Sequence, residues 1–419
     1  MINEEKCIFC FLTSEYQYQL RKIAQLQEER FEKILNRYKK LFLTELKIAL
    51  ETNVCSDHLK ILQAKKINNI FRKNEKLLGK INIFFDGLIS IYTKWISGNA
   101  YSAIEELDEL LKKFELIESE KYGININNKI FYRGRKTAKN SIFNCYDMFH
   151  IPYDKRYLVR NQRYSLSGYP LLYLNASING VLAELGALET ELENYSFSSF
   201  YFNKKYNIYS LLNPFKEYLE SEYKPKQKLI VKNFSTSQKE LTRRLLKLIL
   251  VSVCSFSKRM QYSELEKLGM SIFYEEYVIP QALTQVLRKN DFNGIYYPST
   301  RINSPDKNGL FSQRFFNLAF FPEYRDRHYD YKLFEELDIS TPLSVNSIGY
   351  SGDYSLDKLI LQIKISKLEL SQQIKFLRVL SIYSNLKESI KSENIIEKTL
   401  FYNFIYRTLL NLLGEQREL

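Results

Sequence analysis

Residues 163–188 read RYSLSGYPLLYLNASINGVLAELGAL. After the Gly-Tyr-Pro turn, the apolar run from Leu171 to Leu174 predicts a short β-strand. Beyond it, apolar residues recur at helical spacing, which predicts a helix over about residues 178–192. A strand followed closely by a helix indicates that this part of the chain is a mixed α and β domain.

Proline usage separates this central region from its flanks. All nine prolines lie between Pro152 and Pro342, and because proline is poorly tolerated inside helices, the flanks can be continuously helical. One or two amphipathic helices are predicted over 15–51. Further helices are predicted at 56–76, 77–96, 100–117, 238–256 and 279–289, and beyond 355. Further strands are predicted at 130–132, 229–231, 295–297 and 318–321. We expect an α+β chain with an N-terminal helical domain (1–125), a central mixed domain (126–350) and a C-terminal helical extension (351–419).

The composition of the chain indicates which kinds of partner and which cell compartment to expect. The chain has 419 residues, of which 45% are hydrophobic and 26% charged, as in folded globular proteins. A net charge of +13 favours an anionic partner, and nine basic residues against two acidic ones lie between Lys129 and Arg163. The amino terminus does not resemble a secretory signal, and no apolar run approaches the ~20 residues of a membrane span. The five cysteines form an odd set, which suits reduced thiols in a cytoplasm better than a disulfide framework. We expect a cytoplasmic protein without membrane contact.

Glu184 lies on the predicted central helix. It falls on the same side as Val181, Leu185 and Leu188, so we expect its carboxylate to point inward. A buried carboxylate must pair with a cation, line a cleft or become protonated. A structural ion pair at the helix edge is the alternative to a functional role.

The central region resembles the RES domain, a family of NAD-degrading toxins named for an arginine, a glutamate and a serine. Arg163, Tyr173 and Glu184 have the residue types of the family and are spaced by ten and eleven residues. Upstream, Tyr132 and Arg133 match the Tyr-Arg strand that is typical of family members.

Two downstream stretches extend the resemblance. NGIYYPS at residues 293–299 resembles the Gly-Ile-x-Tyr-x-Ser strand of the family and makes Ser299 the name-giving serine. Tyr277 to Gln281 resembles the helix start that precedes this strand. The resemblance covers about residues 126–350, and its elements occur in the family's order.

The resemblance implies an ADP-ribosyltransferase-like fold that cleaves the bond between nicotinamide and ribose in NAD, with water or phosphate as acceptor. A carboxylate would stabilise the positive charge that develops on the ribose, and arginines would hold the pyrophosphate. The implied site has Glu184, Arg163, Tyr173 and Ser299 as catalytic residues, and Arg133, Tyr132 and Arg163 as the residues that bind NAD.

Neither a P-loop nor a Gly-x-Gly-x-x-Gly fingerprint occurs, so NAD would be bound as a substrate and not in a Rossmann crevice. No cofactor is expected beyond NAD as the substrate. A toxin or anti-phage defence role implies a neutralising antitoxin or a regulatory partner, and the helical flanks predict a homo-oligomer. Two alternatives stay open. One is transfer of ADP-ribose to a macromolecule, and the other is non-catalytic binding of nucleic acid through the +13 charge.

Cys7, Cys10, Cys55 and His58 are zinc-ligand types in two close pairs. Residues 11–54 contain neither glycine nor proline, and a single helix over that stretch would hold the pairs apart by ~55 Å. The pairs could meet only if this stretch folds into a hairpin. We therefore expect no metal site, and we interpret the cysteines as part of a helical packing surface.

Overall fold

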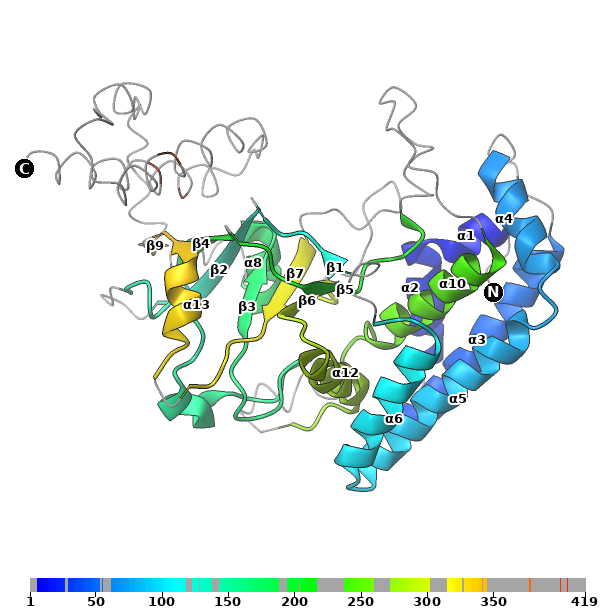
Figure 1. Cartoon of the computed structure of the whole chain (residues 1–419), viewed down its shortest axis with the longest axis horizontal. Helices are drawn as coiled ribbons and strands as arrows, with labels where there is room; N and C mark the ends of the chain where they lie inside the picture. The colour runs from blue at the N-terminus through cyan, green and yellow to red at the C-terminus, as the bar shows by residue number, and fades with distance from the viewer. Residues whose placement is uncertain are drawn as a thin grey trace, which may run out of the picture. The chain divides into compact units, whose positions relative to one another are not determined.

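The protein has an α+β fold, as predicted (Figure 1). The computed structural model describes residues 6–26, 29–52, 55, 62–117, 123–127, 129–137, 143–187, 194–202, 204–216, 237–259, 272–301, 315–325, 328–340, 342–344, 377, 400 and 405. The chain forms two compact units that interleave along the sequence: the first holds residues 1–124, 159–169 and 207–312, and the second holds 125–158, 170–206 and 313–419. The division into three domains stays a prediction, and nearly all of 351–419 lies outside the described residues.

The first unit is built mainly from helices. They are α1 (Ile8–Leu12), α2 (Ser14–Ala24), α3 (Phe31–Glu51), α4 (Leu62–Arg72), α5 (Leu77–Ile96), α6 (Ala100–Lys113), α10 (Gln238–Val253) and α12 (Val278–Lys289). Within the described part of this unit, the helices are accompanied by the strands β1 (Gly123–Ile124), β5 (Ile208–Ser210) and β6 (Gly294–Pro298). Strand β5 pairs with β1 antiparallel and with β6 parallel.

The amphipathic segment predicted over 15–51 forms two helices, α2 and α3, which pack against each other. They are antiparallel, because Tyr16 near the start of α2 donates to Glu45 near the end of α3, while Arg37 donates to the Ala24 carbonyl at the end of α2. Leu26, which continues the apolar spacing of the segment, is 73% exposed because α2 ends at Ala24. The chain therefore reverses direction between residues 24 and 31.

Helix α5 spans Leu77–Ile96, as predicted, and lies in the core of the first unit. Its Phe85 packs edge-on against Tyr38 and Phe42 of α3, with ring centroids 5.8 and 5.5 Å apart. Phe256, which follows α10, packs on Tyr38 with centroids 5.4 Å apart. Helix α12 packs on α5 and α6, and α10 packs on α4 and α5. Segments far apart in sequence thus share one aromatic core.

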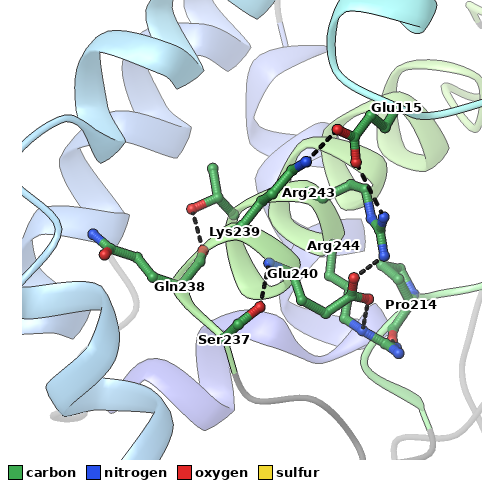
Figure 2. A network of polar contacts seen from close by, with 9 residues as sticks. Glu115, Pro214, Ser237, Gln238, Lys239, Glu240, Arg243 and Arg244 are labelled. Atoms are coloured by element: carbon green, nitrogen blue, oxygen red, sulfur yellow. Dashed lines mark hydrogen bonds and ion pairs between the residues drawn. The ribbon is translucent and has the colours of Figure 1, made fainter.

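Charged side chains fix the start of α10 (Figure 2). Ser237 caps the helix, since its hydroxyl accepts the Glu240 N–H at 3.2 Å. The Glu240 carboxylate binds Arg244 at 2.9 Å and also binds Arg243. Arg243 reaches the carboxylate of Glu115 at 3.5 Å. The network ties α10 to the segment that follows α6.

The second unit is built around an antiparallel sheet. Its strands are β2 (Ile130–Lys136), β3 (Leu172–Asn175), β4 (Tyr195–Phe202), β7 (Phe316–Phe320), β8 (Leu337–Ile339) and β9 (Leu343–Ser344), with helices α8 (Ile178–Leu185) and α13 (Tyr331–Glu336). They pair in the order β7-β3-β2-β4-β8, and β9 also pairs with β4. Strand β4 was not predicted because serines interrupt its apolar sequence, although all of its residues are buried. The strand predicted at 229–231 lies outside the described residues.

Helix α8 packs closely on β2. A Cβ atom at Gly134 would lie 2.8 Å from Val181 Cγ1, so glycine is what permits the approach. Tyr132 of β2 is buried in the same cluster as Ile178 and Val181 of α8. The helix ends earlier than the predicted residue 192, because Gly186 adopts a left-handed conformation with φ of 65° and terminates it.

None of the helices in the described part of the chain combines the length and the apolar character that crossing a membrane requires.

Candidate functional site

The residues predicted from the sequence are divided between the two units. Arg163 and Ser299 belong to the first, whereas Tyr132, Arg133, Tyr173 and Glu184 belong to the second. The contacts of each group within its own unit decide what each side chain can do. The convergence of both groups on one substrate stays a prediction.

Glu184 lies at the last turn of α8 and is half-buried. Its Oε1 accepts a hydrogen bond from Asn317 Nδ2 at 2.6 Å. The predicted apolar stripe is wrong at Leu185, which is 41% exposed, and Leu188 lies outside the described residues. The Glu184 carboxylate is therefore held at the edge of the helix by a neutral donor on β7.

A series of hydrogen bonds holds the donor of this carboxylate in place. Asn317 Oδ1 accepts from Asn175 Nδ2 at 2.6 Å, and Asn175 Oδ1 accepts from the Ser177 N–H at 2.9 Å. The Ser177 hydroxyl in turn caps α8 by accepting the Gly180 N–H at 3.0 Å. Asn175 and Asn317 are 2% and 3% exposed. Because each donor is itself held by the next group, the position of the carboxylate is fixed by the ends of β3 and β7.

Strand register places Tyr173 on the same face of the sheet as this network. Tyr132 pairs with Asn175 across β2 and β3, and Asn175 pairs with Asn317 across β3 and β7. Paired residues point to the same face, and residues two apart in a strand do so as well. Tyr132, Tyr173 and Glu184 are therefore brought to the face that α8 covers.

Arg133 lies on the opposite face, because side chains alternate along β2 and Tyr132 faces α8. Its Nη1 is buried without a hydrogen-bond partner among the described residues. Burial, together with the neighbouring charge of Arg135, lowers the pKa of Arg133 to about 9. The sheet separates this guanidinium from Glu184, so the register gives no support to the predicted contact of Arg133 with the same substrate.

Arg163 is 7% exposed and anchors its loop within the first unit. Its Nη1 donates to the Cys254 carbonyl at 3.0 Å, and its Nη2 donates to the Phe256 carbonyl and to Thr300 Oγ1, both at 2.9 Å. The guanidinium also lies 4.7 Å from the ring centroid of Tyr277. These contacts join residues 159–169 to the end of α10, the start of α12 and the residue after Ser299.

Ser299 follows the last residue of β6, as predicted, and is 5% exposed. Its Oγ accepts the Arg301 N–H at 3.2 Å. The loop of Arg163 is further held by Gln281, whose Nε2 donates to the Gln162 carbonyl at 2.8 Å. The motif elements within the first unit are thus in direct contact.

His150, to which the sequence assigned no role, is buried and neutral. Its Nε2 accepts the Asp330 N–H at 3.1 Å, so Nδ1 carries the proton and donates to the Ile151 carbonyl at 2.8 Å. Burial lowers the pKa of His150 to about 4. The ring supports the fold by joining the segment before η2 (Tyr153–Leu158) to the start of α13.

The structure brings together three of the four residues considered for zinc. The Sγ atoms of Cys7, Cys10 and Cys55 lie within 4.8 Å of one another, and His58 lies outside the described residues. The hydrogen bond with Cys7, burial and the other thiols raise the pKa of Cys10. The expectation of distant pairs was wrong because α2 and α3 form the hairpin that a continuous helix would exclude.

Sequence reasoning did not single out Asn175, Asn317 or Gln281 as functional. Asn317 lies between Phe316 and Leu318 in a buried strand. A polar residue within such an apolar run must satisfy its amide inside the protein, and this pattern is the signal that could have identified it.

Comparisons with known proteins give one informative similarity. No family model and no solved structure matches the chain. The chain is similar to a protein of Bacillus subtilis (strain 168) named "Putative toxin YopC", with 29% identity over 258 residues. The match covers 58% of this chain and 52% of that protein, so the chain spans about half the length of this relative.

Proposed function

We propose that this protein is an intracellular toxin that consumes NAD by cleaving its nicotinamide–ribose bond, with water or phosphate as the acceptor. The observation that carries the proposal is the Glu184 carboxylate, held by Asn317 at 2.6 Å on the face of the sheet that also bears Tyr173. The four RES-like motifs and the similarity to a protein named as a toxin support it.

Cleavage of this bond sends its electron pair to the nicotinamide nitrogen, which loses its positive charge. The ribose C1′ acquires cationic character, as in other glycosyl transfers. A fixed carboxylate beside C1′ stabilises that charge electrostatically and costs no reorganisation during the reaction. An oxygen of water or phosphate then bonds to C1′, and the proton of the acceptor passes to solvent.

We assign roles to the other residues from their positions in the fold. Tyr173 lies on the face of Glu184 and would pack on the ribose end of the substrate. Arg163 is bound to two backbone carbonyls and to Thr300, so we assign it a positioning role in which it fixes the turn that carries Ser299. Ser299 would supply a hydroxyl at the end of β6.

The decisive experiment incubates the purified full chain with NAD and resolves the products by mass. We expect nicotinamide together with ADP-ribose or its 1-phosphate. Glu184→Gln keeps the size of the side chain but removes its charge, and should lower kcat by about 100-fold with a smaller change in KM. Glu335→Gln makes the same exchange at an exposed position of α13 and should leave both constants unchanged.

Other outcomes separate the competing functions. Undiminished turnover in Glu184→Gln would remove the role assigned to the carboxylate. Label transferred from NAD to a protein or nucleic acid would favour ADP-ribosylation of a macromolecule. A chain that leaves NAD intact but binds DNA with a steep salt dependence would favour the non-catalytic alternative.

A toxin role implies a cellular phenotype and a partner that restrains it. Induced expression of the wild-type chain should arrest growth as cellular NAD falls, and Glu184→Gln should not. A neutralising antitoxin or regulatory protein, a cytoplasmic location and self-association through the helical flanks belong to this proposal. Arrest by Glu184→Gln at equal expression would show that toxicity does not depend on the proposed chemistry.

A further inference from the structure

Among the described residues, the sulfur atoms of Cys7, Cys10 and Cys55 form a compact triangle. The Sγ atoms are separated by 3.6 Å between Cys55 and Cys7, 3.7 Å between Cys10 and Cys55, and 3.9 Å between Cys7 and Cys10. A tetrahedral zinc ion with Zn–S bonds of ~2.3 Å holds its sulfur ligands about 3.8 Å apart. A disulfide needs sulfurs ~2.05 Å apart. The triangle therefore matches three vertices of a zinc tetrahedron.

Two helices place these thiols. Cys7 is the N-cap residue of α1 and Cys10 lies one turn later, so both side chains lie on one side of the helix. Cys55 follows α3. Arg72 binds the end of this helix, because its Nη2 donates to the Glu51 carbonyl at 2.8 Å and to the Thr52 carbonyl at 3.3 Å. These bonds fix the chain up to Thr52, three residues before Cys55.

The surroundings suit a structural metal ion. Cys7 is fully buried, and Cys10 and Cys55 are half-buried. Thiolates are soft ligands that select zinc over magnesium or calcium, and a zinc ion that binds displaces the thiol protons. His58 lies outside the described residues, and the three thiols carry the inference without it.

We propose that Cys7, Cys10 and Cys55 bind one zinc ion that joins α1 to the end of α3. The three cysteines belong to the first unit, whereas Glu184 belongs to the second, and the inference does not rest on the proposed NAD chemistry. By closing the hairpin of α2 and α3 at its open end, the ion would stabilise the helical part of the first unit.

The first test measures metal in the full chain, purified without a histidine tag from zinc-supplemented cells. We expect about one zinc per chain by elemental analysis. After removal of the zinc with a chelator, added Co²⁺ should give the intense thiolate charge-transfer absorption of a tetrahedral sulfur site. The chelated protein should also melt at a lower temperature, and zinc should restore the melting temperature.

Variants locate the site. Cys7→Ser, Cys10→Ser and Cys55→Ser should each lose most of the zinc, whereas Cys145→Ser, which changes a half-buried cysteine of the second unit, should retain it. The Co²⁺ spectrum of the wild-type chain tests the site even if a variant fails to fold. Wild-type protein that holds neither zinc nor Co²⁺, a disulfide between any two of the three cysteines, or equal zinc loss in Cys145→Ser would overturn the proposal.

Discussion

The Asn317 amide donates a hydrogen bond to the Glu184 carboxylate. Substitution of Asn317 therefore tests how strongly turnover depends on the position of this carboxylate. Asn317→Ala removes the donor and should lower turnover by about tenfold, equivalent to roughly 1.4 kcal/mol in activation free energy. Asn317→Asp retains an acceptor for Asn175 but sets a second carboxylate against Glu184. We expect the aspartate variant to be the slower enzyme, with melting temperatures measured for both. If Asn317 only supports the fold, Asn317→Ala should be the slower enzyme, because aspartate preserves the shape of the side chain.

His150 gives the stability of the protein a predictable pH dependence. Its pKa is about 4 in the folded chain and about 6.5 when unfolded. Above pH 6.5 the ring is neutral in both states. Between pH 6.5 and 4 only the unfolded chain takes up this proton, so the free energy of unfolding should fall by about 3 kcal/mol as the pH decreases.

His150→Gln removes this titration. Chemical denaturation at a series of pH values should give a shallower decline for the variant than for the wild type across pH 6.5 to 4. Parallel declines would show that the His150 ring is protonated in the folded protein.

At the scale of elements, the start of α8 and the end of β3 are locked together. A Cβ atom at Gly180 would overlap Asn175 Oδ1, so Gly180→Ala should displace Asn175 and with it Asn317. We expect a loss of about 2 kcal/mol in the free energy of unfolding, together with reduced turnover. Calorimetry and the NAD assay measure the two effects.

Gly79→Ala is the matched control for this change. Gly79 is exposed on α5, and an added Cβ would meet nothing within 4 Å. The same substitution there should raise stability by about 0.7 kcal/mol, because alanine favours a helix. A Gly180→Ala variant as stable as Gly79→Ala would contradict the close packing of α8 on β3.

For the whole molecule, interleaving of the two units determines which fragments can fold. Residues 126–350, the segment that carries the motifs, include α10 and α12 but lack α4, α5 and α6, on which those helices pack. We expect this fragment to expose apolar helix faces and to aggregate, whereas the full chain melts cooperatively. Solubility and thermal melting by circular dichroism compare the two. A soluble fragment with a sharp transition would show that the central segment is autonomous.

Local patterns in the sequence specified the elements, whereas contacts between distant residues specified the sites. Helix α5 was predicted with its correct bounds, and the strands near Leu172 and Ile295 were found, because side-chain periodicity is a property of consecutive residues. Strand β4 was missed because its burial depends on neighbouring strands that supply partners for its serines and aromatics.

By itself, the sequence determined the α+β class, most of the helices and the position of Glu184 on a helix that follows a strand. The tertiary structure alone decided that Asn317, 133 residues away, holds this carboxylate. It also decided that Cys55 meets Cys7, 48 residues earlier. The physical reason is that the periodicity of side chains along a helix or strand depends on consecutive residues. A chain reversal such as that between α2 and α3 is instead selected by burial of apolar faces over the whole unit.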